Sequence, residues 1–132
     1  MHKLIIRGDL PCMNEIIAVA KRHHMQYSKM KKSNTELVKL NAWQLPRDLE
    51  RVFITFRWFC KNRKKDPDNI VVGKKFILDG LVEAGVLKND GWKQVAGFKD
   101  EFEVDRDNPR IEIIIEEVVR LNLEKELMYE WT

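Results

Sequence analysis

Alternation of apolar and polar residues predicts three strands along this chain. Residues 3–8 form the first strand, which cannot extend through Pro11. Residues 51–60 form the second strand, and residues 111–115 form the third. The second strand has one wholly apolar face, made of Val52, Ile54, Phe56 and Trp58. A further extended stretch is predicted around residues 93–104, so the chain has the strands for a small sheet.

Apolar residues at near-helical spacing predict helices in two regions. The first begins at Asn14, the expected N-cap, and continues to Trp43 as one long helix or as two helices broken near residues 33–34. Its polar face carries Lys21, Arg22, Lys29, Lys31 and Lys32. A second helix is predicted over residues 70–84, because Gly85 is typical of the position just past a helix.

The order of these elements predicts the fold class. Residues 86–91 are expected to form a short strand or turn, and residues 121–132 a short helix. We therefore expect an α/β (α+β) fold, with a small mixed β-sheet flanked by helices. A length of 132 residues suits one domain, spanning residues 1–132.

Composition narrows the class of protein. The chain is 44% hydrophobic and 34% charged, which is typical of a soluble globular protein. The N-terminus meets a charge before a signal-like apolar region forms, and no stretch approaches about 18 apolar residues. We expect a cytoplasmic protein without a membrane segment. Cys12 and Cys60 are expected to be reduced thiols near strand ends, since two cysteines make no disulfide framework.

The net charge of +3 conceals a strong asymmetry along the chain. Residues 1–75 contain 17 Lys and Arg against 7 Asp and Glu, whereas residues 76–132 contain 7 against 14. Basic residues that share one face of a fold form a binding surface for a polyanion, of which nucleic acid is the commonest. Scattered solvated lysines are the alternative.

A basic run is followed at once by two closely spaced carboxylates. Residues 61–65 (Lys-Asn-Arg-Lys-Lys) precede Asp66 and Asp68, and Pro67 makes the spacing of these two carboxylates fairly rigid. Alternate residues of an extended segment project to one side, so both carboxylates can reach one cation. Mg²⁺ prefers oxygen ligands and is often bound through one or two carboxylates together with substrate phosphate. Asp90, on the turn that follows the next predicted helix, is the natural third carboxylate.

This pair of carboxylates has three other interpretations. An EF-hand loop that started at Asp66 would need an oxygen ligand at its fifth position and glycine at its sixth. This chain has Ile70 and Val71 there, so an EF-hand is excluded. A metal-binding motif of the nucleotide-sugar transferase type needs a larger domain. Capping of the next helix by Asp68 or Asn69 stays open, and one residue can serve both purposes.

The segment from Lys64 to Gly91 resembles the core motif of the RusA-type Holliday junction resolvases, small endodeoxyribonucleases often found in phage and prophage genomes. The residues that carry the resemblance are Asp66, Asp68, Asn69, Lys75, Asp79, Gly80, Leu81, Ala84, Gly85, Asn89 and Asp90. Residues 6–11 with Asn14, and the strand at 109–113, are similar to the start and end of the family. Matching Lys75 requires a three-residue insertion within residues 70–73, because shorter members have lysine where this chain has Val72. Lys74 is therefore a possible substitute.

The resemblance implies a symmetric homodimer that binds four-way junction DNA and nicks two strands of like polarity with Mg²⁺, or with Mn²⁺ as a substitute. It implies that Asp66, Asp68 and Asp90 hold the metal, and that Lys75 binds the scissile phosphate or stabilises the leaving oxygen. Asn69 is expected to orient an aspartate. Asp79 either holds Lys75 in place or is a simple surface partner. The residues expected to bind DNA are Lys61, Arg63, Lys64, Lys65 and Lys74.

The remaining conspicuous side chains give weaker expectations. His23 and His24 are expected to be solvated or to face DNA rather than bind metal, because adjacent histidines point about 100° apart on a helix. Trp92 is expected to cover the core or a loop rather than stack on an unpaired base. The function expected is a magnesium-dependent junction-resolving endonuclease in recombination and repair. The alternatives are a catalytically silent DNA-binding protein and a small nuclease acting on flaps or RNA.

Overall fold

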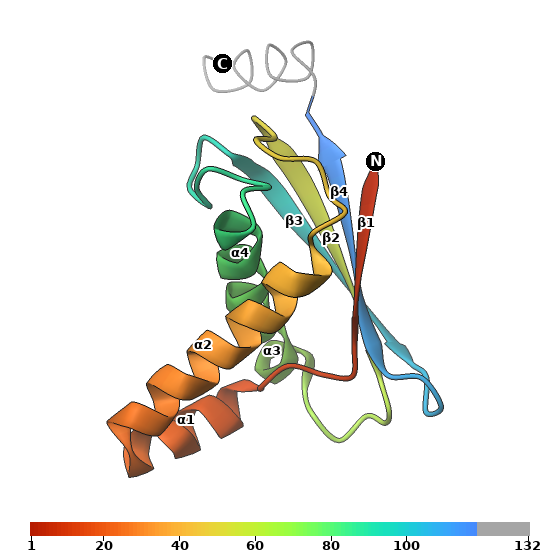
Figure 1. The fold of residues 1–132 in the computed structure, drawn as a ribbon. Coiled ribbons are helices and arrows are strands. Elements are labelled where there is room, and N and C mark those ends of the chain that lie inside the picture. Colours follow the sequence, from red (N-terminus) through yellow and green to blue (C-terminus); the bar gives the residue numbers. More distant parts are fainter. Residues whose placement is uncertain (119–132) are drawn as a thin grey trace, which may run out of the picture.

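The computed structural model describes residues 1–118, and Figure 1 shows how their helices and strands are arranged. The elements in chain order are β1 (His2–Arg7), α1 (Met13–Arg22), α2 (His24–Asn41), β2 (Val52–Cys60), α3 (Pro67–Ile70), a 3₁₀ turn (Val71–Gly73), α4 (Lys74–Glu83), β3 (Val95–Val104) and β4 (Arg110–Glu117). The helix predicted over residues 121–132 lies outside the described residues. The four other predicted strands are present, whereas residues 86–91, expected to be a short strand or turn, form bends and irregular backbone.

Four strands form one mixed sheet in the order β1-β4-β2-β3, which confirms the predicted α+β fold. β4 pairs antiparallel with both β1 and β2, whereas β2 and β3 are parallel. A parallel pair needs a long crossover connection, and α3 and α4 supply it here. The D-P-D motif (Asp66, Pro67 and Asp68) begins this crossover, and Asp90 lies on its return to the sheet.

The helices cover one face of the sheet (Figure 1). The side chains that β2 and β4 turn toward them are apolar and at most 3% exposed, and they are Val52, Ile54, Phe56, Trp58, Ile111, Ile113 and Ile115. This is the apolar face predicted from alternation. On the other face, which no described helix covers, the buried Glu112 carboxylate lies 3.1 Å from Lys3, 3.4 Å from Arg57 and 2.9 Å from Arg110.

The long helical region is two helices, but the break is at His23 and not near residues 33–34. The backbone of His23 is extended, with φ −160° and ψ 116°. The side chains of Ser33 and Asn34 instead donate to the carbonyl oxygen of Met30, so they accommodate the helix without ending it. Cys12, not Asn14, is the N-cap of α1 and forms a capping box with Glu15.

Two further findings bear on the class of protein. Among residues 1–118, no helix is long and apolar enough to cross a membrane. Both cysteines are free thiols, as predicted. Cys60 ends β2 as expected, whereas Cys12 lies at the start of a helix and not at a strand end.

Candidate functional site

The D-P-D motif begins α3, but its carboxylates do not cap that helix. Asp66 occupies the N-cap position with Pro67 in the first turn, and the Asp66 carbonyl oxygen accepts from the N–H groups of Asn69 and Ile70. The Asp66 side chain makes no capping hydrogen bond. Within residues 1–118, the exposed carboxylates of Asp66 and Asp68 have neither a hydrogen bond nor an ion pair. The local capping explanation therefore fails, because neither carboxylate is used for it.

Asn69 connects this motif to the first helix instead of to an aspartate. Its side-chain oxygen accepts from the backbone N–H of Asn14, with 3.0 Å between the two atoms. That N–H belongs to the first turn of α1, where backbone donors lack a partner within the helix. Asn69 thus fixes α3 against the start of α1, and it makes no hydrogen bond to a carboxylate in the described part of the chain.

On the other side of the crossover, Lys75 lies between two carboxylates. Its Nζ is 3.1 Å from Asp79 Oδ1 and 3.4 Å from Asp90 Oδ2. The hydrogen bond to Asp79, followed by the charges of both carboxylates, raises the pKa of Lys75 above its ordinary value although desolvation opposes this. The ammonium group of Lys75 is therefore protonated and held by Asp79 and Asp90, although the Lys75 side chain is 62% exposed. These three residues (Lys75, Asp79 and Asp90) are here called the paired cluster.

The neighbouring Lys74 has a different environment. Its Nζ is 2.8 Å from Asp100 Oδ2, and Trp58 Nε1 donates to the other oxygen of that carboxylate over 2.9 Å. The ammonium also lies over the rings of Phe56 and Phe98, at 5.0 and 4.6 Å from their centroids. Lys74 thus joins α4 to β2 and β3. We conclude that Lys75, and not Lys74, presents its charge beside the predicted acidic residues.

The three predicted metal ligands do not lie together in this conformation. Asp90 is at the paired cluster, whereas Asp66 lines a shallow hollow with Arg63 and with residues 102–104 of β3. Within residues 1–118, no three Asp, Glu, His or Cys side chains are grouped closely enough to hold a metal ion. The set of three carboxylates suits Mg²⁺ chemically, and their joint ligation stays a prediction.

A groove between α2 and α4 has both signs of charge on its walls. α4 and the turn that follows supply Asp79, Glu83 and Asp90, and α2 supplies His24, Tyr27, Ser28, Lys31, Lys32 and Thr35. The two helices approach closely because Gly80 has no side chain: a Cβ there would lie 2.5 Å from Val38 Cβ. The sequence placed Lys31 and Lys32 on a polar helix face, but nothing in their spacing indicated that they face Asp90.

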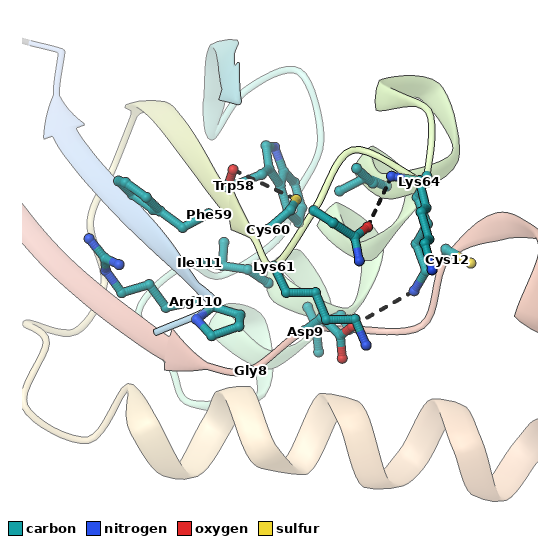
Figure 2. A pocket seen from close by; sticks show the side chains of 15 residues that line it. Gly8, Asp9, Cys12, Trp58, Phe59, Cys60, Lys61, Lys64, Arg110 and Ile111 are labelled. Atoms are coloured by element: carbon teal, nitrogen blue, oxygen red, sulfur yellow. Dashed lines mark hydrogen bonds and ion pairs between the residues drawn. The ribbon is translucent and has the colours of Figure 1, made fainter. Parts of the chain in front are cut away.

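The basic run folds over a cavity at the end of the sheet, which Figure 2 shows from close by. Lys61, Lys64 and Lys65 all line it. Lys65 also pairs with Glu15 at 3.0 Å and with Asp9 at 3.7 Å, and the hydrogen bond to Glu15 raises the pKa of Lys65. The sequence predicted none of these partners, because they lie some 50 residues away along the chain.

The expectation for Trp92 is wrong. Its side chain is 96% exposed, and only its backbone carbonyl is engaged, by Arg51 at 2.9 Å. The turn that contains Trp92 is held by backbone hydrogen bonds, in which the N–H groups of Gln94 and Val95 donate to the carbonyl oxygen of Gly91. Asp100 is the residue that sequence reasoning missed at this site. Nothing in the sequence distinguished it from Glu101 and Glu103 on the same strand.

Comparison with known proteins identifies the family. No curated protein matches the chain. The family model described as Endodeoxyribonuclease RusA matches residues 8–116. This range includes the D-P-D motif, the paired cluster, the basic run and all elements from α1 to β3 with most of β4. The chain belongs to the RusA endodeoxyribonuclease family.

Proposed function

We propose that this protein is a magnesium-dependent, structure-selective endodeoxyribonuclease that resolves four-way DNA junctions by paired symmetric nicks during recombination and repair. Its family implies Holliday junction resolvase activity, and such resolvases generally depend on a divalent metal. The observation that carries the proposal is the unpartnered pair of carboxylates at Asp66 and Asp68, directly after a basic run. Two adjacent anions left without a counter-charge favour binding of an external cation.

Asp66, Asp68 and Asp90 would hold Mg²⁺, with Mn²⁺ as a substitute. When bound, the ion supplies activation of water and neutralisation of charge on the phosphodiester oxygens. Asp66 and Asp68 have no other partner in the described chain, so they are available without cost in lost interactions. Asp90 has one, because Lys75 competes for the same carboxylate at 3.4 Å.

Lys75 would act on the scissile phosphate or on the leaving oxygen. Its ammonium is protonated, exposed and held by Asp79, which limits the volume that a long flexible side chain otherwise explores. A fixed cation at the position where negative charge develops stabilises a transition state more than a mobile one does. This geometry supports a positioning role for Asp79 over simple surface pairing.

The DNA backbone would cross the basic run. Lys61, Arg63 and Lys64 are exposed and make no side-chain ion pair in the described chain, whereas Lys65 is shared with Asp9 and Glu15. Replacing Arg63 and Lys64 by alanine should weaken junction binding and reduce its salt dependence by roughly one unit of slope per lost phosphate contact. An unchanged slope would place the basic run away from the DNA.

Two-fold chemistry supports a homodimer, since cutting two opposed strands of a junction suits a protein with a two-fold axis. Sedimentation of the protein with and without a junction checks this. A monomer under both conditions would refute the dimer but leave the metal and phosphate assignments untouched.

The decisive experiment compares the unmodified protein with Asp66→Asn on four substrates: a mobile four-way junction, a fixed four-way junction, a flap and an RNA duplex. We expect metal-dependent cleavage of junctions by the unmodified protein. Asp66→Asn should abolish cleavage while junction binding stays equal or tightens, because a carboxylate that repels phosphate has been neutralised. Binding without cleavage across Mg²⁺ and Mn²⁺ titrations would identify a silent DNA-binding protein. Preference for flaps or RNA would identify a different nuclease.

A further inference from the structure

The cavity under the basic run has the composition of a site for a flat, anionic ligand. It has a volume of about 420 Å³, within the range of small-molecule sites. Its inner wall is apolar and buried, with Leu10 6%, Trp58 2% and Ile111 3% exposed, and Ile70 of α3 completes it. Figure 2 shows Trp58 and Ile111 together with Lys61 and Lys64 among the side chains that line the cavity. An apolar interior under a cationic rim excludes water from a ring system while leaving a charged group outside.

The rim carries positive charge that the protein does not neutralise. Lys61 and Lys64 have no ion pair among residues 1–118, in contrast to Lys65 and to Arg110, whose partners are Asp105 and Glu112. Asp9 is the acidic residue on the lining and already lies 3.7 Å from Lys65. The cavity mouth therefore has two cations available for an anion that comes from outside.

Asn62 adds a directional polar group. Its side-chain oxygen accepts from the backbone N–H of Lys64 over 3.0 Å, which fixes the amide and leaves its NH₂ group as the donor for a ligand. An amide NH₂ pairs with the carbonyl oxygens and ring nitrogens on the edge of a nucleobase. Neither an apolar peptide side chain nor a lipid tail would use this donor.

We propose that this cavity binds one unpaired nucleotide of the DNA substrate, with its base against the apolar wall and its phosphates at Lys61 and Lys64. The proposal deepens the proposed function and rests on it for the choice of nucleic acid as ligand. Extruding a paired base costs a few kcal/mol, and the cost is smallest for a base that is already unpaired. The cavity therefore selects DNA with unpaired nucleotides, such as those at a strand exchange point, next to the D-P-D motif.

Cys60 makes the cavity testable without any cleavage. It lines the cavity and is part-exposed, whereas Cys12 is 3% exposed. In Cys12→Ser, which retains a donor for Glu15, Cys60 is the single thiol. The rate of its alkylation by iodoacetamide is measured with EDTA present at about pH 9, because burial raises the pKa of this thiol. The probes are a short oligothymidylate and a blunt duplex of the same length, each at a saturating concentration.

We expect the single strand to slow alkylation of Cys60 by about tenfold, because a bound ligand covers most of the lining of its pocket, and the duplex to slow it little. Lys61→Ala with Lys64→Ala should remove this protection at the same probe concentration. The control is Lys99→Ala, which removes a lysine of β3 that does not line the cavity. Asn62→Ala should weaken protection by an intermediate amount.

Three results would overturn the proposal: equal protection by both probes, no protection at saturation, or protection that rises with protein concentration in the absence of DNA. The last would mean that a second copy of the chain fills the cavity. Because EDTA is present throughout, the outcome is independent of the nuclease assay. Protection without junction cleavage sinks the endonuclease proposal alone, and cleavage without protection sinks the nucleotide site alone.

Discussion

The D-P-D motif and the paired cluster lie at the two ends of the same crossover, and they treat charge in opposite ways. At the motif, two carboxylates are exposed and unpartnered in the described chain. At the cluster, each charge has a partner, with Lys75 between Asp79 and Asp90. Opposite charges attract when their side chains come close, as they do at the cluster. Under the proposed function, the unpaired carboxylates would bind the metal ion, and the cluster would already hold Lys75 in place before the ion binds.

The largest effect should come from the unpaired side. Asp68→Asn should reduce junction cleavage about 1000-fold, the upper range for loss of one group that stabilises a transition state. The free energy of unfolding should change by less than about 0.5 kcal/mol, because the carboxylate has no partner to lose. Cleavage kinetics and urea unfolding measure both quantities. Asp107→Asn, an exposed loop carboxylate, is the control, and an equal loss of cleavage in that variant would remove the distinction.

Next, the two adjacent lysines should separate catalysis from stability. Lys75→Met should lower cleavage about 100-fold with little change in unfolding, because its side chain is exposed. Lys74→Met should cost about 1–3 kcal/mol of stability by leaving the part-buried carboxylate of Asp100 without its cation. Denaturation and single-turnover cleavage of both variants give the four values needed. If Lys74→Met is stable but inactive while Lys75→Met is active, the two assignments must be exchanged.

The contact between α4 and α2 holds the helix that carries Lys75 and Asp79, whereas the D-P-D motif lies at the start of α3. Gly80→Ala places a Cβ 2.5 Å from Val38 and 3.0 Å from the Thr35 carbonyl oxygen. Overpacking of this kind costs about 1–3 kcal/mol, which should exceed the gain of about 1 kcal/mol from replacing glycine within a helix. Thermal unfolding should therefore show a net loss. Gly73→Ala, whose nearest contact is 3.2 Å from Leu10 Cβ, should be milder, and the reverse order would contradict this packing.

The smallest expected effect concerns pH: titration of Lys75 should not change the rate of junction cleavage near neutral pH. Its hydrogen bond to Asp79 raises its pKa, so the charged form persists until the pH exceeds a value above 10.5. The contribution of the Lys75–Asp79 ion pair to folding stability is therefore present at neutral pH and is lost only as the pH rises through the raised pKa of Lys75. The ratio of cleavage rates of the unmodified protein and Lys75→Arg should stay constant from about pH 7 to about pH 10. A decline below about pH 9 that arginine abolishes would mean a depressed lysine pKa.

Most of the fold could be predicted from periodic patterns of apolar residues, because these patterns show which face of each element is buried. Strands β2 and β4 were predictable because alternation with a fully apolar face has one stable solution, burial of that face. The end of α4 was predictable because Gly85 adopts φ +78°, which glycine tolerates best. The break at His23 was not, since no proline or glycine marks it. α1 and α2 contact each other on either side of that break, and no local pattern of residues indicates this contact.

For the candidate site, spacing identified which residues belong to the motif but not what they contact. The pairing of Lys75 with Asp79 was predicted from a four-residue spacing and is confirmed at 3.1 Å. By contrast, no spacing in the sequence indicated that Lys74 pairs with Asp100 on β3. Asn69 likewise was expected beside an aspartate, but its oxygen accepts from Asn14.

By itself the sequence determined the strands, the rigid spacing of Asp66 and Asp68, and the unequal distribution of charge, because each depends on residues close together in the chain. Tertiary structure decided which charges are neutralised. Asp90 returns to Lys75, Asp100 takes Lys74, and Lys65 meets Glu15, all across separations of 15 residues or more. Whether a carboxylate is paired or available depends on those distant neighbours, since electrostatic interactions act through space and not along the sequence.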